Sequence, residues 1–393
     1  MSLADDDHTG SRIRQQRKLA RLTQRQLADR LPYSYSLLNQ VECGARPATD
    51  GFVAAVASAL RVDATVLTGT ASVTEIQQGR LAALVRPIRE VLDLFDLEPA
   101  TERQGRPLPE LIASADGVCQ AVRATHLRKA ALVLPGLITD LTRAAQTTPT
   151  TATWQALAST YRTAHDIALK VGYRDLATVA LDRMGWAAQR ASDPCLGAIR
   201  QYKRALGHKK TEHDLGRRLV RAGHELLTDE SSREALAVAG QLHLGASAVA
   251  ARAGDRAAVA AHIAAARDIA DRIGGEAGEV HWLSFGHINI SLHEMGASVA
   301  MKQFDEALKQ ARNLKLPPST PTSRRARFLV DRAVVEMEAG HTDAALRHLV
   351  EARHAAPEQT RYHPGTREAV NGLLHTSRRA PDTLNLMAAW IGL

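Results

Sequence analysis

The spacing of apolar residues limits the fold of this chain more than any other feature. Over residues 75–393 apolar side chains recur about every 3.6 residues, the period of an amphipathic α-helix. Aromatic residues make up only 4% of the chain, whereas strands are enriched in aromatic and β-branched side chains. The apolar run 280–290 is locally compatible with a strand, but its neighbours favour a helix. We therefore expect an all-α protein, and 393 residues are too many for one ordinary core.

Interruptions of this period predict the domain organisation. Residues 1–10 are polar and acidic without periodicity, so we expect a disordered tail. A compact helical unit is expected over residues 11–70, a linker over 71–80 and a larger helical domain over 81–393. The main breaks after the linker carry prolines or glycines, and they fall at residues 98–109, 192–194, 317–321 and 357–365.

Composition disfavours several classes of protein. The three cysteines are few and far apart, which argues against a disulfide framework or a zinc knuckle and favours a reducing cytoplasm. No apolar run approaches the roughly eighteen residues of a membrane span, and the acidic N-terminus is unlike a signal peptide. The formal charge of +8 is compatible with a nucleic-acid partner, and equally with a solvated helical surface rich in arginine.

The stretch 11–67 contains start and stop signals for four successive helices. The first is expected over about residues 12–21, with Ile13 and Ala20 facing inward. Thr23 and Gln26 form a T-x-x-Q capping box at the start of the second helix, which Pro32 ends.

The next two helices follow closely. Ser34 is placed to cap a third helix over residues 35–43, which Gly44 ends in a left-handed conformation. Thr49 or Asp50 caps the fourth. Two helices joined by a tight turn inside a compact helical unit form a helix-turn-helix. The expected buried faces of the last three helices are Leu27, Ala28 and Leu31; Leu37, Leu38 and Val41; and Phe52, Val53, Val56 and Leu60.

The segment LTQRQLADRLPYSYSLLNQVECGARPAT, followed by VAAVASALRVD, resembles the phage-repressor-type helix-turn-helix of the XRE family. The resemblance covers roughly residues 11–70. Two positions depart from it, because Pro32 stands where the family usually has glycine and Cys43 where it has a polar residue. Since proline fixes φ near −65°, we expect a slightly different turn there.

The resemblance implies a role for each matching residue. Arg17 and Glu42 match a buried ion pair, and the alternative is two unrelated surface charges. Gln24 is expected to touch a DNA phosphate, and the third helix is expected to enter the major groove of a double-stranded operator. Ser34, at the start of this helix, is also expected to bind DNA. The residues assigned to base edges are Tyr35, Ser36, Asn39 and Gln40, and those assigned to phosphates are Arg12, Arg14, Arg25 and Arg46.

The larger domain is similar to tetratricopeptide repeats. In AGHTDAALRHLVEARHAAP, Gly340 is followed by Ala345, Leu349, Ala352 and Pro357 at the spacing of the second helix of that repeat. Weaker matches begin at residues 171, 253 and 302. Joined to the first module, this layout is similar to actinobacterial XRE regulators with a tetratricopeptide-like domain. The resemblance implies a curved stack of helix pairs that senses a small molecule or peptide, forms a homodimer, or both. An ordinary alanine-rich helical domain remains the alternative.

One aromatic and polar cluster stands out in the larger domain, and we take it as the candidate ligand site. Its members are His281, Trp282, Phe285, His287 and Asn289. The alternative is that Trp282 and Phe285 belong to the core.

Enzymatic activity is not expected. The pairs His293-Glu294 and His224-Glu225 lack the second histidine of a zinc-peptidase H-E-x-x-H helix, and no phosphate-binding or nucleophile-elbow motif is present. We therefore predict no cofactor and no metal. A sequence-specific transcriptional regulator explains the motifs best. A helical adaptor with secondary DNA binding is the alternative, and an antitoxin-like repressor usually needs a shorter chain.

Overall fold

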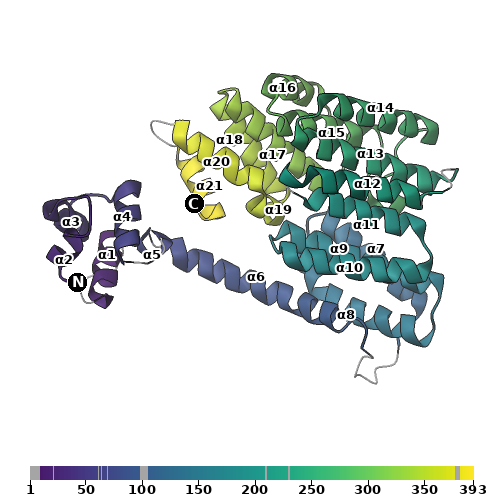
Figure 1. The fold of residues 1–393 in the computed structure, drawn as a ribbon, viewed down its shortest axis with the longest axis horizontal. Helices are drawn as coiled ribbons and strands as arrows, with labels where there is room; N and C mark the ends of the chain where they lie inside the picture. Colours follow the sequence, from purple (N-terminus) through teal and green to yellow (C-terminus); the bar gives the residue numbers. More distant parts are fainter. Residues whose placement is uncertain are drawn as a thin grey trace. The chain divides into compact units, whose positions relative to one another are not determined.

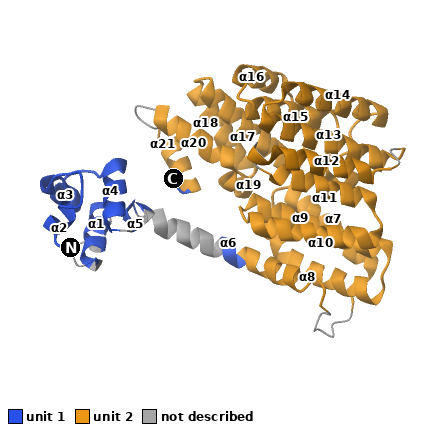
Figure 2. Cartoon of the chain, viewed as in Figure 1, with its two compact units in different colours: residues 1–83, 392–393 blue, residues 84–391 orange. Residues whose placement is uncertain are grey.

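The computed structural model describes residues 9–20, 22–60, 62, 64–68, 70–97, 105–208, 210–228, 231–376 and 381–393. Helices dominate these residues, and the backbone bridge between Ala277 and Phe285 is the one β-type pairing among them (Figure 1). The expectation of an all-α chain is confirmed. The chain divides into unit 1, residues 1–83 with 392–393, and unit 2, residues 84–391 (Figure 2). Nowhere in the described part of the chain is a helix both long and apolar enough to cross a membrane.

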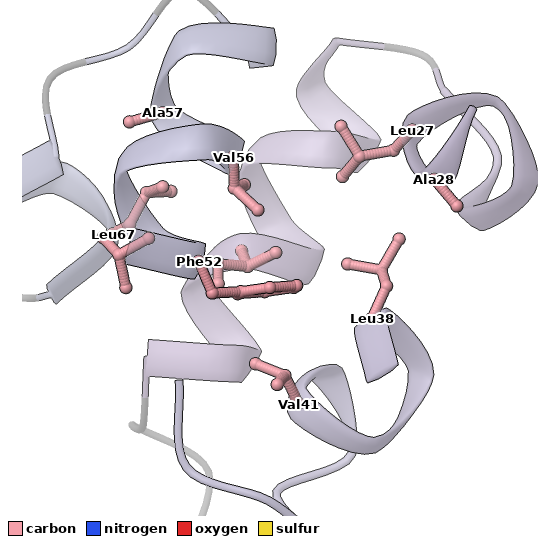
Figure 3. Packing of buried hydrophobic residues seen from close by; sticks show 10 residues of the cluster. Leu27, Ala28, Leu38, Val41, Phe52, Val56, Ala57 and Leu67 are labelled. Carbon is pink, nitrogen blue, oxygen red and sulfur yellow. The ribbon is translucent and has the colours of Figure 1, made fainter. Parts of the chain in front are cut away.

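Unit 1 contains five short helices around one small core. They are α1 (Thr9–Leu19), α2 (Gln24–Ala28), α3 (Tyr35–Glu42), α4 (Asp50–Leu60) and α5 (Ala64–Thr68). Figure 3 shows the apolar side chains of all five helices meeting in the centre, with Phe52 between Leu38, Val41 and Val56. Ile13, Leu27, Leu38, Val56 and Leu67 are fully buried.

The predicted caps of α2, α3 and α4 are present. Thr23 and Gln26 form both hydrogen bonds of the capping box. The Ser34 hydroxyl accepts from the amide of Leu37 at 3.3 Å, and the Thr49 hydroxyl accepts from that of Phe52 at 3.3 Å. Gly44 follows α3 with a φ of +78°, a conformation that costs glycine nothing because it has no Cβ.

The start of the chain differs from expectation. The predicted tail is helical at residues 9–10, because α1 begins at Thr9, and the rest of that tail lies outside the described residues. Since α1 ends at Leu19, Ala20 falls beyond the buried face and is exposed.

A continuous helix, α6 (Thr70–Asp93), passes through residues 71–80, where we expected a linker. Half of that stretch consists of good helix formers, and its polar side chains therefore did not mark a break; these residues are Ala71, Glu75, Gln77, Gln78 and Arg80. Within unit 2, Val85, Ile88 and Leu92 of α6 are buried.

Unit 2 continues with fifteen α-helices among the described residues, most of them joined by short turns. Consecutive helices pair as hairpins, namely α7 with α8, α9 with α10, α11 with α12, α13 with α14, α15 with α16 and α17 with α18. Their bounds are α7 (Leu108–Arg123), α8 (Leu127–Thr147), α9 (Thr151–Lys170), α10 (Arg174–Ala191), α11 (Pro194–Gly207), α12 (His213–Leu226), α13 (Arg233–Ala253), α14 (Arg256–Ile273), α15 (His287–Ala300), α16 (Phe304–Asn313), α17 (Thr322–Glu338), α18 (Thr342–Ala355), α19 (Pro357–Tyr362), α20 (Pro364–Thr376) and α21 (Asp382–Ile391).

The four repeat-like segments occupy equivalent places in these hairpins. Each contains the second helix of a pair, α10, α14, α16 or α18, and each turn includes one residue with positive φ. That residue is Gly172, Gly254, Lys302 or Gly340, with φ of +93°, +81°, +58° and +80°. A left-handed residue reverses the chain directly after a helix, which explains why the same local pattern recurs without a fixed repeat length.

Two local expectations were wrong. Residues 280–290 do not form one helix, because η2 (Val280–Trp282) is a single 3₁₀ turn and Gly286, with a φ of +151°, precedes α15. Residues 357–365 are not a break, since Pro357 and Pro364 each open a helix, where proline is tolerated. The break at residues 192–194 is confirmed by Ser192, which has a φ of +52°.

Candidate nucleic-acid interface

A buried ion pair joins the first and third helices of unit 1. Arg17 on α1 donates from Nε to Glu42 Oε1 at 2.7 Å and from Nη2 to Oε2 at 2.8 Å. Arg17 is 8% exposed and Glu42 3%. The hydrogen bond to Glu42 raises the pKa of Arg17 although burial opposes this shift. Arg17 also donates to the carbonyl of Leu22 at 2.8 Å, so one side chain connects α1, the turn after it and the end of α3.

Gln24 connects α2 to α3. Its amide nitrogen donates to Glu42 Oε2 at 2.8 Å and to Asn39 Oδ1 at 3.4 Å, and its oxygen accepts from the Tyr35 hydroxyl at 3.3 Å. The sequence assigned Gln24 to a DNA phosphate and did not indicate this network. Both ends of the Gln24 amide are therefore engaged by side chains of α3.

The outward side of α3 is polar. Tyr35 is 49% exposed, and Ser36, Asn39 and Gln40 are exposed as well. On the opposite side Leu38 and Val41 are buried. Ser34 is exposed but acts as the helix cap through its hydroxyl oxygen. The structure therefore places the four residues assigned to base edges on one accessible helix, and Ser34 at its start.

Three of the four arginines assigned to phosphates are exposed and available. Arg14, Arg25 and Arg46 form no ion pair with any described residue of the chain. Arg12 is half-buried. Exposed guanidinium groups without a carboxylate partner can neutralise phosphates without first breaking an internal interaction.

The candidate ligand cluster of unit 2 is only partly accessible. Phe285 is fully buried and Asn289 is 2% exposed, so these two residues belong to the core and not to a ligand groove. The burial follows from the loop before α15, where the amide of Ala277 donates to the Phe285 carbonyl at 2.8 Å and turns the ring inward against Gly240. His287 is exposed. His281 and Trp282 line a small cavity of about 40 Å³.

Comparison with known proteins identifies the domain that unit 1 contains. A helix-turn-helix domain family matches residues 9–68. No solved structure gives a significant match.

Two relatives with known names come from Mycobacterium tuberculosis, one from strain CDC 1551 / Oshkosh and one from strain ATCC 25618 / H37Rv. Both are described as uncharacterised HTH-type transcriptional regulators. Each is 36% identical over 115 residues, a stretch that covers 29% of this chain and 76% of the relative. With a helix-turn-helix domain at its N-terminus and relatives at this identity and coverage, the chain belongs to the helix-turn-helix-type transcriptional regulators.

Proposed function

We propose that this protein is a sequence-specific DNA-binding regulator of the phage-repressor (XRE) type, and that α3 reads base edges in the major groove. One observation carries the proposal. The buried side of α3 is held by the Arg17–Glu42 ion pair and by Gln24, whereas Tyr35, Ser36, Asn39 and Gln40 remain exposed. A rigid helix with a polar outer face is what direct readout requires.

The side chains on that face have the chemistry to distinguish bases. The Gln40 amide can donate to and accept from one adenine at the same time, and Asn39 and Ser36 can contact a neighbouring base. Arg25 and Arg46 would hold the duplex through its phosphates, which sets the register without reading the sequence. Gln24 would act through α3, as a positioning residue.

A single module of this size contacts few base pairs, so we propose that the protein binds as a homodimer. The expected operator has two half-sites about one helical turn apart. Unit 2 is much larger than unit 1, and we assign it the dimer contact and the binding of a small-molecule or peptide effector. Its helical hairpins and left-handed turns favour the tetratricopeptide-like interpretation.

Selection of binding sites from random DNA tests this function. Full-length protein should enrich one two-fold symmetric motif, and Gln40→Ala should lose or broaden it at one position of each half-site. Arg217→Ala, which alters an exposed arginine on α12 of unit 2, is the control and should enrich the same motif as the wild type. Absence of any enriched motif, or an identical motif from the Gln40 variant, would contradict base reading by α3.

A further inference from the structure

Three arginines from three different helices bind three consecutive carbonyls of the loop before α15. Arg162 on α9 donates to the carbonyl of His281 at 2.6 Å, Arg123 on α7 donates to that of Trp282, and Arg324 on α17 donates to that of Leu283 at 3.3 Å. The elements that carry the arginines are far apart in sequence. Their side chains converge on one short segment, residues 281–283.

This convergence borders the cavity of about 40 Å³. We call it the arginine cavity. Arg123, Arg162 and Lys203 supply three positive charges to its wall, and Asp166 supplies the one carboxylate. Lys203 donates to Asp166 at 2.7 Å. The remaining lining residues are Cys119, Val122, Thr163, His281, Trp282 and Leu283.

Two of the cations in the cavity wall, Arg123 and Arg162, have no ion-pair partner among the described residues. Arg162 is only 4% exposed, and its described partners are a carbonyl, the Ser159 hydroxyl at 3.1 Å and the Cys119 sulfur at 3.7 Å. Arg123 likewise bonds a carbonyl and lies against the Trp282 ring. Neither guanidinium has a described carboxylate within ion-pair distance. A buried cation without a counter-ion is costly, because carbonyl dipoles replace only part of its hydration.

The pKa values of Arg123 and Asp166 reflect the excess of positive charge in the cavity wall. Burial, together with the nearby charges of Arg324 and Arg162, lowers the pKa of Arg123 to about 10. Burial alone would raise the pKa of Asp166, but Lys203 and the other cations lower it to about 2. The wall therefore holds three cationic side chains and one carboxylate, an excess of two positive charges.

We propose that the arginine cavity binds a doubly charged oxyanion of the phosphate type, as inorganic phosphate or as the phosphate group of a small metabolite. The two uncompensated charges match a dianion. The volume matches as well, because one water needs roughly 10–15 Å³ of such space and the cavity therefore holds only a few non-hydrogen atoms. A guanidinium group donates two parallel hydrogen bonds to two oxygens of one phosphate, whereas a backbone carbonyl offers only one oxygen. As an effector site, the cavity rests on the regulatory function proposed above.

The bound anion would compete with the segment 281–283 for the same arginines. His281, Trp282 and Ser284 have φ angles of +43°, +54° and +61°. Residues other than glycine rarely adopt this region of backbone conformation. The arginine–carbonyl bonds hold that conformation. An oxyanion that takes over the guanidinium groups would release it, and Trp282, whose indole donates to Asp116 at 3.0 Å, would report the change.

Calorimetric titration of the full-length protein, without DNA, tests the site. The probes are inorganic phosphate and glucose 6-phosphate in chloride buffer. We expect saturable binding of one anion per chain, weakened at least tenfold in Arg162→Met and Lys203→Met. Arg221→Met removes an exposed arginine from α12 and should bind like the wild type. If Arg162→Met does not fold, as judged by circular dichroism, the less buried Lys203 decides the result.

The two probes distinguish the sources of the anion. Tighter binding of glucose 6-phosphate assigns the site to a phosphorylated metabolite, and equal or tighter binding of inorganic phosphate assigns it to the free ion. No saturable binding of either probe overturns the proposal, as does binding that both cavity variants leave unchanged. Because no DNA is present, failure here is independent of base reading by α3, which the Gln40 variant tests separately.

Discussion

Arg17 and Glu42 lie 25 residues apart and meet through two parallel hydrogen bonds of 2.7 and 2.8 Å. Glu42 also accepts from Gln24, so one carboxylate joins α1, α2 and α3. The ion pair therefore determines how the exposed face of α3 is presented.

Replacement of Arg17 by methionine in the full-length protein should unfold unit 1 preferentially. The change leaves the Glu42 carboxylate buried without its cation, which costs roughly 3–5 kcal/mol. Hydrogen exchange of the α1–α4 amides should accelerate, while exchange in α9 and α13 stays unchanged. The double variant Arg17→Met with Glu42→Leu should regain much of the protection, since it removes both charges. Unchanged exchange in the single variant would show that the pair contributes little.

Gln40→Ala and Tyr35→Ala should each weaken operator binding by roughly 1–3 kcal/mol with little effect on folding. Both side chains are exposed. The Gln40 side chain makes none of the described bonds that hold α3, and Tyr35 contributes only the 3.3 Å bond from its hydroxyl to Gln24. Fluorescence anisotropy with operator and scrambled duplexes measures the difference. Gln24→Ala is the comparison, because it should loosen α3 and lower unit 1 stability as well as affinity. If the Gln40 variant binds the operator as tightly as the wild type does, α3 does not read bases through Gln40.

Arg25→Ala and Arg46→Ala should weaken binding to operator and random DNA alike. Each removes about one phosphate contact, so the slope of log affinity against log salt should fall by about one. The measurement is a salt titration of both duplexes between low and moderate ionic strength. Arg217→Ala in unit 2 serves as the control, and its slope should equal that of the wild type. A variant that loses affinity for the operator alone would be a base contact instead.

Three histidines from successive helices of unit 2 form a stack that should make its stability depend on pH. The rings of His224 and His243 are 4.7 Å apart, those of His243 and His262 are 5.4 Å apart, and the Nδ1 atoms of the second pair lie at 3.1 Å. Burial, together with the neighbouring His224 and His262, lowers the pKa of His243 to about 4. Histidine in the unfolded chain has a pKa near 6.5. Between about pH 4 and 6.5 the unfolded chain therefore binds more protons than the folded one.

Stability should accordingly be complete above about pH 6.5 and should fall as the pH drops toward 4. His243→Phe should reduce this slope, measured by urea unfolding at several pH values. It should not abolish the slope, because burial also lowers the pKa of His293, to about 3. His375→Phe alters an exposed histidine on α20 and should leave the pH profile unchanged. An identical slope in the His243 variant would show that the stack does not titrate in this range.

Gly240 and Phe285 should behave as one packing unit. A Cβ at Gly240 would lie 2.1 Å from Phe285 Cζ, so Gly240→Ala should cost roughly 1–3 kcal/mol. Phe285→Ala should cost roughly 3–5 kcal/mol because it opens a cavity in the core. In the double variant the new methyl has room, and the cost of Gly240→Ala should shrink or vanish. Urea unfolding of the four proteins measures this coupling, and strictly additive costs would place Phe285 elsewhere.

The sequence predicted local features of unit 1 well. The Thr23 capping box, the Ser34 cap and the left-handed Gly44 depend on hydrogen bonds between residues two to four positions apart, so local sequence specifies them. The pairing of Arg17 with Glu42 came from family resemblance, since nothing in the spacing of two distant charges indicates contact. The network of Gln24 was missed, because an exposed-looking amide gives no sequence signal for its partners.

In unit 2 the sequence determined the helices, and only the tertiary structure decided which distant side chains meet. The 3.6-residue period established the helices, because that period reflects burial of one face, and glycines marked several turns. The 3.6-residue period did not show that Phe285 and Asn289 are buried while Trp282 lines a cavity, because the loop before α15 follows no period. The arginine cavity depends on Arg162 and Arg123 contacting carbonyls 119 and 159 residues away. Periodicity reports which face of a helix is buried, whereas only the packing of the helices decides which distant side chains share a cavity.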